Sequence, residues 1–315
     1  MGAGCESLSN QRILVTGGSG FIGPHLCRAL CTCGAEVHAV SRKQDRNESC
    51  PRGWQADLSE IDTARKLLKS IRPDLIFHLA GYAVGGRDLK LVLPTFQSNT
   101  VTTVILLTAA AEIGCRRIVV AGSLEEPEMG EEFAVPSSPY AAGKWASSAY
   151  ARMFHRLYQT PVVIARLFMV YGPGEPNTQK LVPLTITSLL SGAPLNLSSG
   201  VREVDWIYVD DVVDGLILAA QAPSVEGSTI DLGSGRLVSV RSVVETLVEI
   251  TGSGVKPQFG AIKDRLMEQV RKANLQATRA KIGWEPKIPL NQGLSLTVDW
   301  YKGLLKKAIA PATGN

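Results

Sequence analysis

The sequence predicts an α/β protein built on a doubly wound parallel sheet, with a smaller α/β lobe toward the C-terminus. In the first half of the chain, short runs rich in Ile, Val and Leu alternate with longer segments of helical periodicity. This alternation is typical of parallel strands with helices on both faces of the sheet. After Tyr171, two glycines and two prolines within residues 172–176 break the pattern, and the remainder mixes loops, short helices and isolated strands.

Each strand of the main sheet is predicted from one short apolar run, because parallel strands are buried on both faces. The predicted strands are Arg12 to Thr16, Glu36 to Val40, Leu75 to Leu79, Arg117 to Ala121 and Val162 to Leu167. The predicted helices between them are Phe21 to Cys33, Ile61 to Ile71, Val101 to Ile113 and Ser138 to Tyr158. Two later runs, Asp205 to Val209 and Thr229 to Leu232, are expected to return to the main sheet.

Composition excludes several classes of protein. The net charge of +4 is mild and scattered, which argues against a nucleic-acid partner. No apolar run has the length of a membrane span, and the four histidines have no ligand-like spacing, so we expect no membrane and no metal. Residues 1–10 lack the apolar core of a signal peptide. We expect 1–10 and 306–315 to be loose tails.

Cysteine usage bears on the compartment. Cys27, Cys31 and Cys33 lie in one predicted helix, and such a cluster suits a reducing compartment better than a disulfide framework. Cys27 and Cys31 are four residues apart, which favours two small buried apolar side chains. We therefore expect a cytoplasmic protein.

A glycine-rich turn follows the first predicted strand and opens the first predicted helix. Residues 16–23 read Thr-Gly-Gly-Ser-Gly-Phe-Ile-Gly and fit both GxGxxG and GxxGxxG. Glycine permits a tight turn and lets the backbone approach a pyrophosphate, to which the helix N-terminus offers N–H groups. The order of strand, turn and helix predicts a dinucleotide site in a Rossmann-type domain. Its expected contacts are Gly17, Gly20, Phe21, Ile22 and Gly23.

The end of the second predicted strand indicates which dinucleotide binds. Sites for NAD usually carry Asp or Glu here, whereas this chain has Ser41, Arg42 and Lys43. An arginine attracts the 2′-phosphate that an acid would repel. We therefore expect NADP, with NAD as the alternative cofactor and Ser41 and Arg42 as contacts. A solvated basic loop is the other interpretation.

Two more strand ends are expected to contact the cofactor. Asp57 and Leu58 follow the third strand of the sheet, expected between Val40 and Ile61, where a carboxylate can reach the adenine amino group. Leu79, Ala80 and Gly81 end the fourth strand beside the glycine turn, and their small size leaves room for the cofactor.

These motifs place the domain boundaries. Residues 11–171 are expected to form the NADP-binding Rossmann domain, with returning segments near 203–232. Residues 172–202 and 233–305 are expected to form the second lobe, which is therefore discontinuous in sequence; its role as the substrate-binding lobe is implied by the family resemblance given below.

A tyrosine and a lysine predict proton chemistry. Tyr140 and Lys144 are four residues apart and share one face of a predicted helix that opens after Pro139. A nearby ammonium lowers the pKa of a phenol from about 10, so Tyr140 can give or take a proton at a carbonyl or hydroxyl carbon. Lys144 can also hydrogen-bond the nicotinamide ribose. Alone the pair fits a surface helix equally well; after a cofactor turn it indicates a catalytic pair.

Two residues near the fifth predicted strand complete the candidate catalytic set. Strand C-termini in open parallel sheets line the ligand crevice. Ser123 ends this strand and can donate a hydrogen bond to the reacting oxygen. Glu125 follows two residues later, either as an active-site base or as a solvated loop acid.

Together these residues resemble the extended short-chain dehydrogenase/reductases, which are nucleotide-sugar epimerases, dehydratases and reductases. The resemblance runs from about Arg12 to Tyr301. Besides the turn and the Tyr140–Lys144 pair, it rests on Asp57-Leu58, His78-Leu79-Ala80, Asn99, Ser123, Arg166-Leu167-Phe168, Tyr171-Gly172-Pro173-Gly174, Trp206-Ile207-Tyr208-Val209-Asp210-Asp211 and Ile282-Gly283-Trp284-Glu285-Pro286.

The resemblance implies a Rossmann domain, a small C-terminal substrate lobe and a homodimer formed through paired helices. It implies that Ser123, Tyr140 and Lys144 are the catalytic set and that Asn99 contacts the cofactor. It also implies a nucleotide-diphosphate sugar as substrate. The expected substrate contacts are Tyr82, Lys180, Arg202 and Arg265, the two arginines holding the diphosphate.

Three departures from the family pattern affect the substrate. Met169 replaces the usual Asn before Val-Tyr-Gly, and Val204 stands where Arg usually precedes the Asp of the next strand. After Ser123, residues 126–128 read Glu-Pro-Glu instead of Val-Tyr-Gly. The resulting Gly-Ser-x-Glu-Glu pattern is similar to that of reductases acting on 4-keto-6-deoxyhexose nucleotides.

Four activities remain open at this point. The leading interpretation is an NADPH-dependent reductase of a 4-keto nucleotide sugar, supported by Arg42 and the Ser123 region. The alternatives, in order, are a 4-epimerase, a 4,6-dehydratase and a reductase of a non-sugar ketone. Glu125 supports the dehydratase, because in related dehydratases a Glu at this position removes the C5 proton. Some of those dehydratases also use a neighbouring acidic residue, and in this chain that position is Leu124. Met169 favours the non-sugar ketone. A cofactor-binding regulator without turnover is disfavoured by the intact catalytic set.

Overall fold

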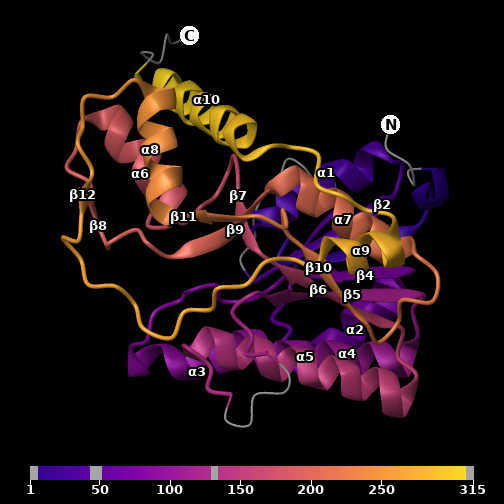
Figure 1. Cartoon of the computed structure of the whole chain (residues 1–315). Helices are drawn as coiled ribbons and strands as arrows, with labels where there is room; N and C mark the ends of the chain where they lie inside the picture. The colour runs from indigo at the N-terminus through magenta and orange to yellow at the C-terminus, as the bar shows by residue number, and fades with distance from the viewer. Residues whose placement is uncertain (1–5, 43–51, 129–133, 310–315) are drawn as a thin grey trace.

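The predicted fold class is confirmed. A computed structural model describes residues 6–42, 52–128 and 134–309, and in this part of the chain the main sheet has seven parallel strands in the order β10-β6-β5-β4-β1-β2-β3 (Figure 1). Their bounds are β1 Arg12–Thr16, β2 Glu36–Ser41, β3 Arg52–Gln55, β4 Leu75–His78, β5 Arg117–Ser123, β6 Val162–Leu167 and β10 Thr229–Leu232.

Helices cover both faces of this sheet. Helices α2 (Ile61–Ile71), α4 (Thr102–Ile113) and α5 (Pro139–Tyr158) pack on one face, and α1 (Ile22–Thr32), α7 (Val209–Gln221) and α9 (Leu275–Ile282) on the other (Figure 1). Strand β1 feeds both layers, because successive side chains of a strand point to opposite faces. Ile13 and Val15 lie in the core under α1 and α7, whereas Leu14 lies in the core under α2 and α4.

The second lobe lies beside one end of the main sheet (Figure 1). It contains a three-stranded sheet in the order β11-β9-β7, a strand pair β12-β8 and helices on a core of their own. The bounds are β7 Met169–Tyr171, β8 Asn196–Leu197, β9 Glu203–Tyr208, β11 Leu237–Ser239, β12 Gln258–Phe259, α6 Leu181–Ser191, α8 Val240–Thr251 and α10 Leu290–Ile309.

One of the two expected returns to the main sheet is correct. Strand β10 pairs in parallel with β6, as predicted. Strand β9 does not join the main sheet. The chain leaves that sheet after β6, and the next strand, β7, pairs in parallel with β9, whose other edge pairs with β11. The boundary between the two domains stays a prediction.

The expected tails are partly ordered. Residues Glu6–Leu8 form a 3₁₀ turn whose Leu8 is fully buried in the core beside α1. At the other end, α10 continues to Ile309. Burial of Leu8 and helical continuity therefore overturn the expectation for these residues, and residues 1–5 and 310–315 lie outside the described part of the chain.

One helical run passes the length and composition test for a membrane span, contrary to the sequence expectation. It extends from Leu89 to Ile113, starts earlier than the predicted Val101, and has a mean hydropathy of 1.2. Its α4 portion packs between α2 and α5, where Leu106 and Leu107 are buried in the core. This is the position of a core helix of a globular domain.

The cysteines of α1 behave in two ways. Cys27 is buried in the core and Cys31 packs against it, which confirms their interpretation as small apolar side chains. Cys33 is disulfide-bonded, which differs from the reduced cluster expected from the sequence. The cytoplasmic location stays a prediction.

Candidate active site and cofactor pocket

The glycine turn has the geometry that its sequence predicts. Gly17 has φ +73°, and a Cβ at this position would lie 2.8 Å from the backbone nitrogen of Ala80. A Cβ at Gly23 would collide with the carbonyl oxygen of Gly17. The Gly20 N–H donates to that same oxygen over 3.0 Å and closes the turn. Glycine therefore lets β1, the turn and α1 pack against the end of β4.

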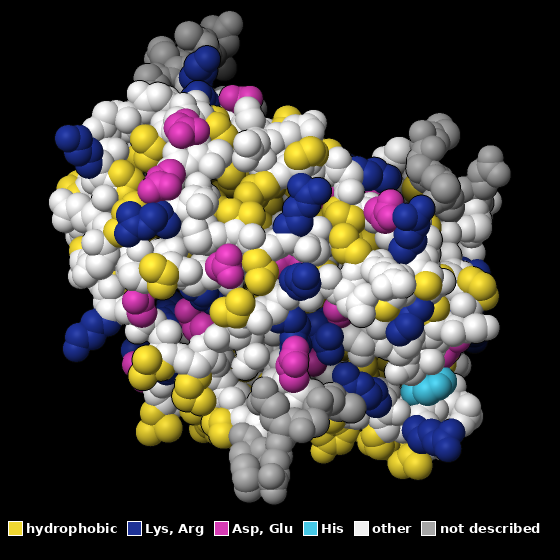
Figure 2. Space-filling model, in the orientation of Figure 1, with side chains coloured by type: hydrophobic (Ala, Val, Ile, Leu, Met, Phe, Trp, Pro, Cys, Tyr) yellow, Lys and Arg dark blue, Asp and Glu magenta, His cyan; other side chains and the backbone are white. Residues whose placement is uncertain are grey.

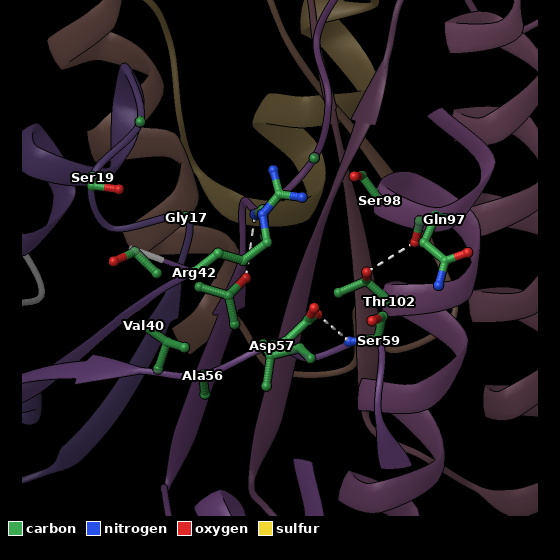
Figure 3. A pocket seen from close by; sticks show the side chains of 16 residues that line it. Gly17, Ser19, Val40, Arg42, Ala56, Asp57, Ser59, Gln97, Ser98 and Thr102 are labelled. Carbon is green, nitrogen blue, oxygen red and sulfur yellow. Dashed lines mark hydrogen bonds between the residues drawn. The ribbon is translucent and has the colours of Figure 1, made fainter. Parts of the chain in front are cut away.

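A cavity of about 230 Å³ opens beside the turn (Figure 3). Eight of the predicted cofactor residues line it: Gly17, Gly20, Ser41, Arg42, Asp57, Leu58, Ala80 and Gly81. Sequence reasoning missed its far wall, formed by Gln97 and Ser98 of the π-helix Phe96–Val101 and by Thr102 at the start of α4. The signal that could have found them is that this helix begins at the same sheet edge, where small polar side chains face a ligand crevice.

Arg42 extends into the middle of this pocket (Figure 3). Asp57 lies below it and accepts a 2.9 Å hydrogen bond from the Ser59 N–H, which holds the pKa of Asp57 below its usual value. A guanidinium and a carboxylate thus lie together in the pocket, and their contact with the adenosine end of the cofactor stays a prediction. Lys43, the other predicted cation, lies outside the described residues.

The remaining predicted cofactor residues lie next to the cavity. Phe21, on the turn, lies under the ammonium of Lys180, 5.8 Å from the ring centroid. Ile22 and Leu79 pack against the core. Buried Asn99 accepts a 2.6 Å hydrogen bond from the N–H of Tyr82, and so ties the segment after β4 to the helix that follows.

The fold brings the predicted catalytic residues together. Ser123 ends β5, and Tyr140 and Lys144 lie on α5, where Ser138 caps the N-terminus by accepting from the Ala141 N–H over 3.2 Å. The side chain of Tyr140 lies close enough to Ser123 for the serine to lower the pKa of the phenol, and Lys144 Nζ donates to the Ala121 carbonyl over 2.8 Å.

Gly81 connects this group to the cofactor cavity. A Cβ at Gly81 would lie 3.5 Å from Lys144 Nζ and 2.8 Å from Asn99 Oδ1. Only glycine leaves this approach open, so the cavity and the catalytic lysine are neighbours.

The protonation of the pair differs from the sequence expectation. Burial raises the pKa of Tyr140 to about 12, and the opposing effect of the Ser123 side chain is smaller. The pKa of Tyr140 is therefore not lowered as the sequence predicted, because desolvation decides it and Lys144 is not among the groups that shift it. Burial also lowers the pKa of Lys144 to about 8. At neutral pH, Tyr140 carries its proton.

Two of the predicted substrate contacts, Arg202 and Arg265, form one ionic cluster with Glu125 and Glu268. Arg202 donates to Glu125 Oε1 over 2.8 Å and lies 3.0 Å from Glu268 Oε1. Arg265 approaches the same Glu268 oxygen at 3.9 Å. Glu125 is thus a half-buried ion-pair partner of Arg202 and not a solvated loop acid. Lys180 bonds elsewhere, donating to Glu175 Oε2 over 2.6 Å.

Sequence reasoning missed Glu126 as a site residue. It is 2% exposed, and its carboxylate accepts from the backbone N–H of Ser123 over 2.7 Å. Among the described residues, no group of three or more His, Cys, Asp and Glu side chains could hold a metal ion.

Comparison with known proteins fits this geometry. The model of the NAD dependent epimerase/dehydratase family matches residues 13–233, which span the main sheet and helix α5. The chain belongs to this family.

Two curated relatives and one solved structure illustrate how far the likeness of this family member extends. It is 29% identical to the dTDP-glucose 4,6-dehydratase of Haemophilus influenzae, over 92% of this chain and 98% of the relative. It is 30% identical to the UDP-glucose 4-epimerase of Mycolicibacterium smegmatis, over 93% and 99%. The UDP-glucose 4-epimerase of Thermus thermophilus, solved with NAD, has a TM-score of 0.82 at 26% identity, over 93% and 99%.

Membership settles the coarse class of the molecule. This epimerase/dehydratase family member is an extended short-chain dehydrogenase/reductase, and its cofactor is a nicotinamide dinucleotide.

Proposed function

We propose that this enzyme reduces the 4-keto group of a nucleotide-diphosphate sugar, with NADPH as the hydride donor. The observation that carries the proposal is the protonated Tyr140 beside Ser123, with a pKa raised to about 12 by burial. A reductase must donate a proton to the oxygen that forms at C4, and a phenol that keeps its proton at neutral pH is set for this direction.

Each catalytic side chain has a distinct task in this reaction. Hydride comes from the dihydronicotinamide when the cofactor is bound. Ser123 donates a hydrogen bond that places the carbonyl oxygen, and Tyr140 transfers its proton to that oxygen. Lys144, held by the Ala121 carbonyl, supplies positive charge beside the phenol as the proton leaves.

The substrate would lie between β5 and the segment that carries Arg265. Arg202 and Arg265 share Glu268 as a counter-ion, and both guanidiniums suit a diphosphate. A bound diphosphate would compete with Glu268 for Arg202. Tyr82 and Lys180 flank the cofactor side of this space and complete the proposed substrate contacts.

Glu125 argues against the dehydratase. A general base needs an oxygen directed at the substrate, but Oε1 of Glu125 is held by Arg202, and its Oε2 accepts from the Ser137 hydroxyl at 3.4 Å. A 4-epimerase is the second candidate, supported by the 30% identity to a UDP-glucose 4-epimerase. It must first remove a proton from the C4 hydroxyl, for which a neutral Tyr140 is less suited.

The preference for NADP is also a proposal. Its support is Arg42 in the pocket and the lack of an acid at the end of β2, whereas the Thermus thermophilus epimerase was solved with NAD. We expect Arg42→Ala to lower kcat/KM for NADPH by about tenfold while leaving kcat/KM for NADH within about twofold, a loss equal to one charge-assisted contact. Equal efficiency with both cofactors in variant and wild type would refute this preference.

One experiment separates the candidate reactions. The protein is incubated with a panel of nucleotide sugars and their 4-keto derivatives, and NADPH absorbance and product mass are followed together. A reductase oxidises NADPH and adds two hydrogens. An epimerase changes stereochemistry at constant mass, and a dehydratase loses water; either result would overturn the reductase.

We also propose a homodimer formed through the helical layer of α3 (Val92–Thr95) and α5. Leu93, Phe96, Leu157 and Tyr158 are each more than half exposed on these helices or beside them. Hydrophobic side chains gather over α3 at the lower left of Figure 2. Apolar surface of this kind marks an interface.

A further inference from the structure

The buried carboxylate of Glu126 occupies a gap that the sheet leaves open. Strand β4 ends at His78, opposite Val120, so β5 continues for three residues without this neighbour. The Leu124 N–H bonds Leu167 on the β6 side, and backbone groups alternate along a strand, so the Ser123 N–H faces the side where β4 has ended. Glu126 Oε1 accepts from that N–H over 2.7 Å.

Lys144 fills the same gap from the other direction. Its Nζ bonds the carbonyl of Ala121, two residues before Ser123 on the same side of β5. Glu126 and Lys144 therefore satisfy consecutive outward-facing backbone groups of one strand. An acceptor takes the N–H and a donor takes the carbonyl, which is the arrangement that buried polar groups require.

The charges around Glu126 are mostly positive. Lys144 and Arg152 of α5 and Arg166 of β6 face it, and Arg166 is paired at 3.1 Å with Asp231 of β10. Burial raises the pKa of Glu126, while the Ser123 N–H and these cations oppose the rise. The negative charge of Glu126 raises the pKa of Tyr140, and that of Glu125 raises it less.

Room for the carboxylate depends on Gly122. A Cβ at Gly122 would lie 2.8 Å from Glu126 Oε1 and 3.0 Å from a methyl carbon of Ile164. Gly122, the glycine of the Gly-Ser-x-Glu-Glu pattern, thus leaves room for the carboxylate of Glu126 beside β5.

We propose that Glu126 is a positioning residue of the catalytic site. Its buried carboxylate fixes Ser123 by accepting from the serine's backbone N–H, and its negative charge stabilises the ammonium form of Lys144. This inference rests on the proposed function for the catalytic roles of Ser123 and Lys144. The negative charge of Glu126 acts on both members of the Tyr140–Lys144 pair. Removing this charge therefore lowers both of the pair's macroscopic pKa values. The direction agrees with the structure, where Glu126 raises the pKa of Lys144 against the larger lowering by burial.

The test is Glu126→Gln, which keeps the acceptor oxygen and removes the charge. The titration of the Lys144 side chain is followed by NMR in isotope-labelled protein without substrate, the signal being assigned by its loss in Lys144→Met. We expect the midpoint to fall from about 8 in the wild type by about one pH unit. Glu128→Gln is the matched control, because Glu128 is exposed and paired with Arg271, and its midpoint should stay unchanged.

An unchanged midpoint in folded Glu126→Gln would overturn the proposal, as would an equal shift in Glu128→Gln. Should the Gln variant fail to fold, Glu126→Ser takes its place, since it removes the charge and leaves room for a water molecule that can accept from the Ser123 N–H. A second readout is the pH–rate profile with the 4-keto substrate, whose basic limb should move to lower pH. The titration needs no turnover, so an inactive wild type would refute the proposed function and leave this test standing.

Discussion

At the scale of the residue, Tyr140 is the proposed proton donor, and its replacement tests this role. We expect Tyr140→Phe to lose about 100-fold or more in turnover, which is the usual contribution of a positioned general acid. Cofactor affinity, measured by fluorescence titration, should change little, because the phenyl ring keeps its packing. Tyr150→Phe is the control, since Tyr150 is 41% exposed on the same helix. Wild-type turnover in Tyr140→Phe would contradict the mechanism.

Lys144 links the catalytic site to stability. Its pKa is about 8 in the folded protein and 10.5 in its unperturbed form, so the folded state binds fewer protons between these values. Burial of the ammonium therefore destabilises the protein below pH 8, and this cost disappears as the pH rises toward 10.5.

We expect the stability of the wild type relative to Lys144→Met to rise by about 2 kcal/mol from pH 7 to pH 10, since a tenfold change in proton affinity is worth about 1.4 kcal/mol. Urea denaturation of both proteins at the two pH values measures this difference. A difference independent of pH, or one of opposite sign, would exclude a depressed lysine pKa.

The sequence located most of the site but not its electrostatics. The ends of the predicted strands and the helical spacing were enough to predict that Ser123, Tyr140 and Lys144 share one site. Glu126 escaped notice because its burial depends on β4 ending before β5, which is a property of the sheet and not of the local pattern. For the same reason the sequence misjudged the pKa of Tyr140, where desolvation decides.

At the scale of the element, the glycine turn holds α1 against the main sheet. A Cβ at Gly23 would collide with the Gly17 oxygen and lie 2.7 Å from the Gly18 Cα, both of them backbone atoms that cannot move away. We expect Gly23→Ala to destabilise the protein by about 2 kcal/mol, the cost of overpacking, and to weaken cofactor binding at least tenfold. Thermal unfolding and fluorescence titration measure these effects.

Gly303→Ala is the matched control for that substitution. Gly303 lies on α10, and a Cβ there would meet nothing within 4 Å, so alanine should stabilise the helix slightly. Equal behaviour of the two alanine variants would show that the turn tolerates a side chain and that its glycines serve another purpose.

Elements of the main sheet could be predicted because their apolar runs are continuous and lie between glycine turns and periodic helices. Strand β9 was also found as a strand, but its sheet was wrong. Its residues alternate little and are almost all buried, which fits either sheet. Its partner depends on β7, a three-residue strand that no sequence pattern marks.

At the scale of the whole molecule, the two lobes meet around the proposed substrate site. Asp205, fully buried on β9, accepts hydrogen bonds from the backbone of Ser234, Gly235 and Ala273. Asp205 thus joins the second lobe to the loop after β10, three residues from the Arg202 that bonds Glu125. Arg202 itself bonds Glu125 of the main domain, so the proposed substrate site lies where the two lobes are in contact.

The proposed dimer concerns the outer surface of the whole molecule. Leu93 is 75% exposed beside Phe96, on the helical layer that also presents Leu157 and Tyr158. A charge at the centre of an apolar interface costs several kcal/mol, so we expect Leu93→Arg to be monomeric at concentrations where the wild type is dimeric. Light scattering after size-exclusion chromatography measures the mass.

Leu304→Arg, a similar change at an exposed leucine of α10, should remain dimeric, because α10 belongs to the second lobe. If the wild type is a monomer, or if only Leu304→Arg dissociates, the α3–α5 layer is not the interface. If Leu93→Arg is monomeric and still active, each chain holds a complete site, as the position of Ser123, Tyr140, Lys144 and the cofactor pocket within one chain requires.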